Sequence, residues 1–228
     1  DEYGYQNNMY IVAEEILKKV TGQDWESYIT EHLLEPLKMT ETRTSGNKIQ
    51  EEQELAYPII NGKLVDITMK RPHAAASLFT STTELSHWAQ MILDNGIYQG
   101  DTILPAEVIE DMMTGRTLQS VAGLKKMAGA HFSQYALGWS VWDYHGTTVA
   151  EHGGGMPGYI SKLVLLPKEN MAFIILTNTL SNFPTALEYH LLSELVHDNP
   201  TNWIELLELA TNYINKKFVY KATKRNKY

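Results

Sequence analysis

Cysteine is absent from the 228-residue chain. Thiol catalysis, disulfide bridges and zinc sites built from thiolates are therefore excluded within it. The absence does not decide the compartment, because a chain without cysteine is compatible with both the cytoplasm and the periplasm.

Long apolar runs are absent as well. The longest candidates, such as residues 171–176, have the length of a strand rather than of a membrane-spanning helix. The opening residues Asp1-Glu2-Tyr3 contain no basic region, no apolar region and no initiating Met, so no signal peptide is visible. We expect no membrane span, and the opening is typical of the interior of a protein.

An excess of positive charge is also missing. The formal net charge is −8 and the isoelectric point is near 5.5, whereas a general nucleic-acid binder needs a basic surface that neutralises phosphates. The lysines and the arginine of residues 216–228 form a short basic tail, which we interpret as a solvated terminus or linker. No nucleic-acid partner is expected.

The chain has the composition of an ordinary globular protein that can bury a core, with 43% hydrophobic and 20% charged residues. Before Ala130 the apolar residues recur every three or four positions, which predicts helices. These predicted helices cover residues 8–20, residues 24–34, the residues after the capping-box sequence Ser81–Glu84, and Pro105 to Gly115. Residues 38–71 are predicted to be loops with short extended pieces at 56–60 and 63–67.

After Ala130 the apolar spacing changes to two, which predicts strands. Four predicted strands cover residues 136–144, 147–151, 159–166 and 171–177. The turns between them carry Gly146, Gly153–Gly158 and Pro167–Asn170, and links this short require antiparallel pairing. Two helices, over about 184–196 and 201–217, close the chain and can pack on the sheet.

The predicted fold class is α/β of the α+β type. It comprises a mainly helical region at residues 1–130, an antiparallel sheet with C-terminal helices at residues 131–218, and the basic tail at residues 219–228.

Two short stretches could carry chemistry. The first is Tyr5-Gln6-Asn7, set against the first predicted helix, where it is either simple capping and packing or half of an active site. The second is His152 with Gly153–Gly155, where the missing side chains let backbone approach a ligand and let an N–H donate to a developing oxyanion. The alternative for the second stretch is a flexible hairpin turn that happens to contain a histidine.

The order of these motifs resembles the serine β-lactamase-related family, which includes penicillin-binding DD-peptidases, class C β-lactamases, D-aminopeptidases and esterases. In chain order the motifs are Tyr-x-Asn, "EPLKMTET", "SLFTSTTEL", "YALGWSV" and "HGGGMPGY", followed by a strand that ends in "LTN". Each motif alone is a weak signal, but the series covers most of the chain. The resemblance implies a β-lactamase-like fold, with an antiparallel sheet flanked by helices and a helical region, whose N-terminal part is missing.

The resemblance also implies roles for single residues. Tyr5 matches the catalytic tyrosine that moves a proton from the nucleophile to the leaving group, and Asn7 matches the asparagine that binds the amide or acyl side chain of the substrate. His152-Gly153-Gly154 matches the Lys-Thr-Gly element, and Gly155 would follow as a backbone donor of the oxyanion hole. Histidine favours the phenolate of a nearby tyrosine only when protonated, so the peptidase or esterase branch is favoured over penicillin hydrolysis.

The nucleophile of that family is a Ser-x-x-Lys at the start of a helix, well upstream of the tyrosine. Only four residues precede Tyr5 here. The tetrapeptide Ser45–Lys48 matches the Ser-x-x-Lys pattern, but it follows the tyrosine motif instead of preceding it. It also contains a glycine, and no apolar residues at helical spacing follow it. We therefore do not assign it as the nucleophile. We therefore expect this chain to be inactive by itself.

The expected function is part of a serine hydrolase that cleaves an amide or ester bond through an acyl-enzyme, without a cofactor or a metal ion. Its expected partners are a small-molecule, peptide or ester substrate and either an N-terminal companion segment of the same protein or further copies of the chain, because the sheet would otherwise have an open edge. A binding or scaffolding protein that keeps the fold is the alternative. A zinc hydrolase is a third, although His145 and His152 have no partner at ligand spacing. The expected location is the periplasm or the outside of the cell.

Overall fold

The computed structural model describes residues 2–46, 49, 55–67, 73–76, 78–196 and 200–211. The chain divides into two compact units, residues 1–180 and 181–228. The predicted division into a helical region, a sheet region and a tail stays a prediction, and the predicted basic tail lies outside the described residues.

The first two predicted helices form close to their predicted bounds. α1 spans Asn8–Thr21 and ends at Gly22, whose φ of 78° is a left-handed conformation that glycine adopts without strain. α2 spans Trp25–Ile29, with Asp24 as its N-cap, and continues as a π-helix, η1, over Thr30–Leu34.

The capping box of the third predicted helix is half formed. α3 spans Thr82–Leu93, and the Ser81 hydroxyl accepts the N–H of Glu84 at 3.2 Å, as predicted. The Glu84 carboxylate instead fixes a segment far upstream in the chain, where it accepts the N–H of Glu41 at 2.7 Å and the hydroxyl of Thr42 at 2.6 Å.

Several shorter elements connect the main ones. The strands β1 (Ile59–Ile60) and β2 (Lys63–Leu64) pair as a hairpin and lie within the predicted extended pieces. The strands β3 (Ile97–Tyr98) and β4 (Asp101–Thr102) pair as a second hairpin. The remaining short elements are η3 (His73–Ala75), α4 (Ala106–Met113), α5 (Gly123–Met127) and η4 (Pro167–Glu169). The helix α4 follows Pro105 as predicted, whereas α5 and the β3–β4 hairpin have no counterpart in the sequence prediction.

In the described residues, six strands form one sheet in the order β10-β9-β8-β7-β6-β5, and every neighbouring pair is antiparallel. The strands are β5 (Thr117–Leu118), β6 (Ser133–Tyr135), β7 (Ser140–Tyr144), β8 (Thr147–Met156), β9 (Tyr159–Leu166) and β10 (Met171–Thr177). The predicted antiparallel sheet with a helical region is confirmed, and β9 and β10 have their predicted bounds.

Two of the strand predictions are wrong at one end. The sequence predicts a strand over residues 136–139, but these form the turn between β6 and β7, where Gly138 has a φ of 83°. The sequence predicts a turn over Gly153–Gly158, but β8 continues through three of these glycines to Met156, and only Pro157 and Gly158 form the turn. Glycine has low strand propensity and no side chain to alternate, so no pattern marked this part of the strand.

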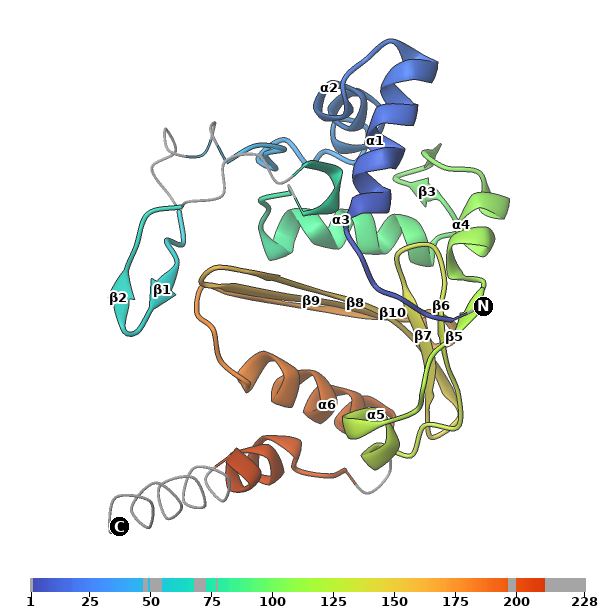
Figure 1. The fold of residues 1–228 in the computed structure, drawn as a ribbon. Helices are drawn as coiled ribbons and strands as arrows, with labels where there is room; N and C mark the ends of the chain where they lie inside the picture. The colour runs from blue at the N-terminus through green and yellow to red at the C-terminus, as the bar shows by residue number, and fades with distance from the viewer. Residues whose placement is uncertain are drawn as a thin grey trace. The chain divides into compact units, whose positions relative to one another are not determined.

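The core of the first unit lies between α3 and one face of the sheet (Figure 1). Met91 and Ile92 of α3 are buried against this face. Paired residues of neighbouring strands share a face, and the buried set Val141, Ala150 and Leu165 runs across β7, β8 and β9 in this way.

The helix α1 turns its apolar side outward. Its spacing predicts an amphipathic helix, and the apolar side is ordinarily the buried one. The structure leaves apolar side chains along one side of the helix exposed: Met9, Val12, Ile16 and Val20. The buried residue of α1 is Glu14, whose carboxylate accepts the N–H of Ala74 at 2.9 Å and lies 3.2 Å from Nδ1 of His73.

The second unit contains α6 (Phe183–Val196) and a helix described over residues 203–211. The rings of Tyr189 and Trp203 lie 5.1 Å apart and join these two helices. The cap of the second helix is Asn202 rather than the predicted Thr201, because the Asn202 side chain accepts the N–H of Glu205 at 3.2 Å. The predicted packing of these helices on the sheet stays a prediction. Among the described residues, no helix is both long enough and apolar enough to cross a membrane.

Candidate functional site

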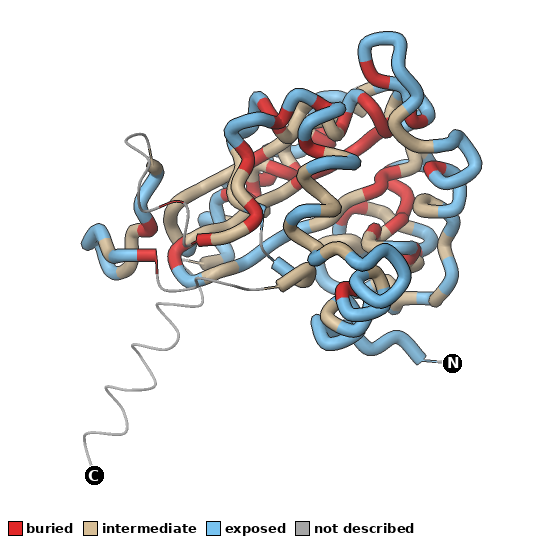
Figure 2. The backbone as a smooth tube through the Cα atoms, turned by 90° about the horizontal axis from the view of Figure 1, so that it is seen from above, coloured by how far each residue is buried: buried red, intermediate tan, exposed pale blue. Residues whose placement is uncertain are grey.

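Residues 2–7 form an irregular segment that leads into α1 and runs beside the end of the sheet at β5 and β6 (Figure 1). The Tyr5 side chain is 55% exposed, and its ring lies 6.3 Å from the ring of Tyr135 in an edge-to-face arrangement. The ring of Tyr3 contacts the same tyrosine at 5.2 Å. The N-terminal segment therefore packs against Tyr135 through the rings of Tyr3 and Tyr5. Figure 2 shows the backbone next to the N-terminus as exposed.

Tyr135 itself is poorly suited to move a proton. Its burial raises the pKa of the phenol well above the ordinary value, and the neighbouring Tyr10 hydroxyl raises that pKa further. The raised pKa disfavours the loss of the Tyr135 proton. Tyr5, on the exposed side of this contact, is the tyrosine of the pair that can meet a substrate.

Asn7 occupies the N-cap position of α1 without acting as a cap. Its side chain makes no capping hydrogen bond with the described residues of the helix, and it is exposed. The first turn is instead closed by its backbone carbonyl, which accepts the N–H of Tyr10 at 3.1 Å. Capping by Asn7 is thus contradicted, and its amide is available to a ligand.

His152 lies on β8, and its Nδ1 donates to the backbone carbonyl of Gly138. Because a carbonyl oxygen only accepts, Nδ1 must carry hydrogen, which leaves Nε2 to accept a proton or, once protonated, to donate one. A Cβ built on Gly138 would lie 3.7 Å from the Tyr10 hydroxyl. Gly138 therefore lies near the first turn of α1 and contacts the histidine strand.

The first motif and the histidine are linked through the turn between β6 and β7. Tyr5 contacts the ring of Tyr135 at the end of β6, and the carbonyl of Gly138, in the turn that follows, accepts a hydrogen bond from His152. Sequence analysis missed Tyr10, Tyr135 and Gly138 as parts of the site. The motif "YALGWSV" contains Tyr135 and Gly138, but its sequence does not indicate that they contact Tyr5 and His152.

Gly153–Gly155 lie where β8 extends beyond β7. The β7–β8 ladder ends with Ser140 opposite Glu151, whereas the β8–β9 ladder continues to the pair Met156–Tyr159 at the turn. In an antiparallel ladder the N–H groups of one strand alternate between its two sides. Since Met156 bonds with Tyr159 across the two-residue turn, the N–H groups of the first and third glycines point away from β9, toward the edge that β7 has left open.

Gly154 and Gly155 differ in whether their surroundings leave room for a side chain. A Cβ on Gly154 would lie 2.4 Å from Oγ of Ser161 on β9, so this position is crowded. A Cβ on Gly155 would have no described atom within 4 Å, and its φ is not positive. Neither packing against a described atom nor a positive φ requires glycine at position 155.

A polar network on the other face of the sheet holds the last β7–β8 pair in place. Nζ of Lys125, on α5, donates to Oγ of Ser140 at 2.6 Å and lies 3.2 Å from the Glu151 carboxylate. It also lies 5.1 Å from the centre of the Trp142 ring. The network clamps the strand one residue before His152, and neither the spacing nor the types of its residues signalled it in the sequence.

The structure does not support Ser45–Lys48 as the nucleophile motif. Ser45 lies in an irregular segment rather than at the start of a helix, and Lys48 lies outside the described residues. Within the part of the chain that the structure describes, no three His, Asp or Glu side chains lie together as metal ligands.

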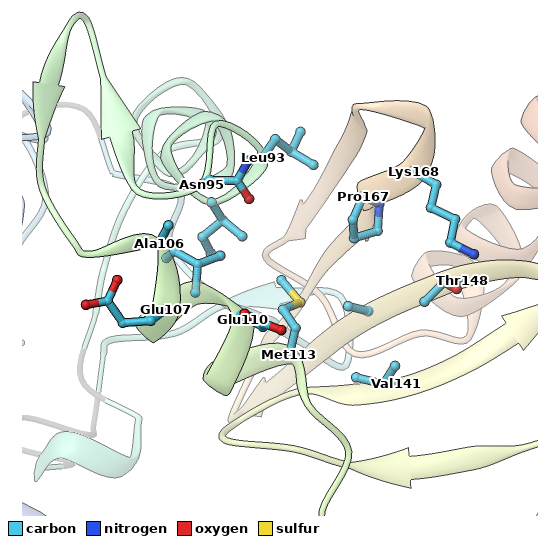
Figure 3. A pocket seen from close by; sticks show the side chains of 13 residues that line it. Leu93, Asn95, Ala106, Glu107, Glu110, Met113, Val141, Thr148, Pro167 and Lys168 are labelled. Atoms are coloured by element: carbon cyan, nitrogen blue, oxygen red, sulfur yellow. The ribbon is translucent and has the colours of Figure 1, made fainter.

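A cavity of about 530 Å³ lies on the helix-covered face of the sheet, away from the predicted motifs. Figure 3 shows Glu110 and Met113 of α4 on one side of it and Val141 and Thr148 of the strands on the other. Most of its lining is apolar, and none of the predicted site residues reaches it.

Comparison with known proteins gives sequence relatives that are longer than this chain. The chain is 25% identical to Protein flp of Staphylococcus aureus (strain MW2) over 205 residues, which cover 86% of the chain and 37% of that protein. It is 26% identical to Unguisins hydrolase ungD of Aspergillus violaceofuscus (strain CBS 115571) over 218 residues, 84% of the chain and 37% of that protein. The chain thus spans well under half the length of these curated relatives.

Solved structures share the fold. The octameric penicillin-binding protein homologue from Pyrococcus abyssi has a TM-score of 0.72 at 23% identity, over 88% of this chain and 44% of that one. The D-amino acid amidase from Ochrobactrum anthropi, in complex with L-phenylalanine amide, has a TM-score of 0.56 at 18% identity, over 77% and 49%.

The family model described as Beta-lactamase matches residues 1–196. That range includes the Tyr-x-Asn segment, the histidine strand and the turn at Gly138 that joins them. The chain belongs to the beta-lactamase family.

Proposed function

We propose that this chain supplies the tyrosine–histidine side of the active site of a serine hydrolase, which cleaves an amide or ester bond through an acyl-enzyme. The observation that carries the proposal is the link from Tyr5 to His152 through the turn between β6 and β7, where Tyr5 contacts Tyr135 and the Gly138 carbonyl accepts a hydrogen bond from His152. The names of a relative and a structural neighbour, a hydrolase and an amidase, support acyl transfer as the class of reaction.

In this proposal a serine from a part of the protein outside this chain attacks the carbonyl carbon of the substrate. Its proton passes to the phenolate of Tyr5, which returns it to the nitrogen or oxygen of the leaving group. Water then attacks the acyl-serine ester and releases the acid. Tyr5 suits this role because it is exposed, in contrast to the buried Tyr135.

The other residues bind and orient the substrate. The N–H of Gly155 points to the open edge of β8 and donates to the developing oxyanion, while the Asn7 amide, free of any capping bond, holds the substrate beyond the reacting carbonyl. His152 acts through Nε2, since its Nδ1 donates to the backbone carbonyl of Gly138.

The proposed partners are the substrate and the part of the protein that carries the serine. That part is a companion segment of the same protein, and further copies of the chain are a separate proposed partner. The octameric state of the Pyrococcus abyssi homologue is the reason to include a homo-oligomer among these partners.

The test is to label the complete gene product with a fluorophosphonate probe and to map the modified residue by mass spectrometry. We expect one modified serine outside this chain, and Tyr5→Phe should slow its labelling by a factor of about 10² to 10⁴. Tyr3→Phe is the matched control, because Tyr3 also contacts Tyr135 but lies outside the motif. Absence of a labelled serine would favour the non-catalytic scaffold, and equal rates for the two variants would remove Tyr5 from the mechanism.

A further inference from the structure

The ammonium group of Lys125 contacts three neighbouring strands of the sheet. Nζ donates to Oγ of Ser133 on β6 at 3.3 Å and to Oγ of Ser140 on β7 at 2.6 Å. It also lies 3.2 Å from Oε1 of Glu151 on β8. The two serine hydroxyls in turn donate to Oε1 of Gln119, at 3.1 and 2.9 Å. A lysine ammonium has three N–H donors and no acceptor, so the three oxygens around it match its donors.

A serine and a lysine within hydrogen-bond reach can also act as a nucleophile and its base. The directions of the hydrogen bonds argue against that role here. The hydroxyl of Ser140 donates to Gln119, and Lys125 donates to Ser140 rather than accepting its proton. An ammonium that donates to three oxygens has no lone pair with which to take up a proton. Ser140 is therefore not the nucleophile of the proposed reaction.

The network lies directly beside the proposed site. Ser140 and Glu151 form the last pair of the β7–β8 ladder, and His152 is the next residue of β8. Because side chains alternate along a strand, His152 projects from the opposite face of the sheet. Its Nδ1 donates to the carbonyl of Gly138, two residues before Ser140. Lys125 thus holds both the strand that carries the histidine and the segment that carries its acceptor.

The charges of Lys125 and Glu151 depend on each other. Their side chains are only 18% and 16% exposed, and Oε2 of Glu151 is buried without a hydrogen-bond partner among the described residues. Removing one charge of such a pair leaves the other poorly solvated, which is more unfavourable than removing both. Without Lys125, the Glu151 carboxylate is expected to turn toward water and to displace the last β7–β8 pair.

We propose that Lys125 is a positioning residue for His152. By holding Glu151 and Ser140 together it fixes the point at which β7 separates from β8, and with it the orientation of the histidine and the start of the open glycine edge. This inference rests on the proposed function for the role of His152 in the reaction, but not for the arrangement that Lys125 maintains.

The test compares two neighbouring lysines of α5 in the complete gene product. Lys125→Met removes the charge and keeps an unbranched side chain near the Trp142 ring, and Lys126→Met, at an exposed position, is the matched control. Fluorophosphonate labelling of the serine is followed for each variant. The hydrogen bond of His152 is followed separately through the proton resonance of its Nδ1–H, in protein with isotope-labelled histidine. The His152→Gln variant assigns this resonance.

We expect the serine of the Lys125→Met variant to be labelled about tenfold more slowly than in the unsubstituted protein, because a small displacement of groups in a site lowers the rate steeply. The Nδ1–H resonance of His152 should weaken or disappear in the same variant. Lys126→Met should leave both readouts unchanged. Equal labelling of the two variants, or slower labelling with an unchanged His152 resonance, would overturn Lys125 as a positioning residue.

Glu151→Gln tests the other member of the pair, and it should slow labelling to a similar degree. The double variant Lys125→Met with Glu151→Gln should be no slower than the slower single variant, because removing both charges leaves neither unpaired. A double variant whose loss is the product of the two single losses would show that the residues act independently and would overturn the pair. If Lys125→Met does not fold, Glu151→Gln provides the test with a smaller change and the same readouts.

The two proposals fail separately. Absence of a labelled serine would overturn the proposed function, while the His152 resonance would still decide whether Lys125 holds the histidine. A labelled serine whose rate, together with the His152 resonance, is unchanged in Lys125→Met would overturn the positioning role and leave the proposed function in place.

Discussion

The helices α1 and α3 both have apolar residues at amphipathic spacing, but the apolar side is buried in α3 and exposed in α1. The apolar residues Met91 and Ile92 of α3 are buried against the sheet, and Ser81 caps its first turn. In α1 the apolar residues face outward, Glu14 is the buried residue, and Asn7 provides no side-chain cap. The difference teaches that periodicity shows that a helix has an apolar side, but not which molecule or segment covers it.

The largest contrast concerns apolar side chains. In this chain Met91→Ala should lower the free energy of unfolding by about 2 to 5 kcal/mol, because Met91 is fully buried and its loss leaves a cavity. Ile16→Ala should change that free energy by less than about 0.5 kcal/mol, because Ile16 is 57% exposed. Urea denaturation followed by circular dichroism measures both. Similar losses for the two variants would show that α1 is buried after all.

The buried glutamates give the next contrast. Glu84→Ala should cost about 1 to 3 kcal/mol, because it leaves the N–H of Glu41 and the hydroxyl of Thr42, itself buried, without their acceptor. Glu14→Ala should cost less, about 1 kcal/mol, because the partner His73 is partly exposed to water.

Glu15→Ala is the control for both glutamates, since Glu15 is exposed on α1, and it should stay within about 0.5 kcal/mol of the unsubstituted chain. The same denaturation experiment applies. A Glu14→Ala variant as stable as this control would mean that α1 is not held by its buried side.

The helix starts give the smallest contrast. Ser81→Ala should cost about 1 kcal/mol, since the hydroxyl accepts an otherwise unpaired N–H of the first turn. Asn7→Ala should cost no more than a few tenths of a kcal/mol, because its side chain caps nothing. Thermal unfolding monitored at 222 nm ranks the two. If Asn7→Ala lost as much stability as Ser81→Ala, the Asn7 side chain would have a structural role at the start of α1.

Much of the fold could be predicted because it depends on local signals. Alternating apolar residues between sharp turns gave the bounds of β9 and β10, and Gly22 and Ser81 marked helix ends. The course of β8 through Gly153–Gly155 could not be predicted, because glycine carries no side chain and its pairing is decided by the neighbouring strand. The orientation of α1 was likewise hidden, because tertiary contacts of Glu14 fix it.

The site could be predicted as a set of motifs but not as an arrangement. Tyr5, Asn7 and His152 were identified from their order along the chain. The hydrogen bond of His152 goes to the backbone carbonyl of Gly138, in a turn where φ is positive. Lys125 reached Glu151 only through the folding of α5 against the sheet. Such contacts connect residues far apart in sequence and leave no periodic signal.

The early end of β7 sets a spacing that a bound molecule has to match. The N–H groups of Gly153 and Gly155 face the same open edge two residues apart, a separation of about 6.8 Å along a strand. That distance is too long for both groups to donate to one carbonyl oxygen. A molecule that engages both would have to offer two acceptors as far apart as those of alternate residues in an extended peptide.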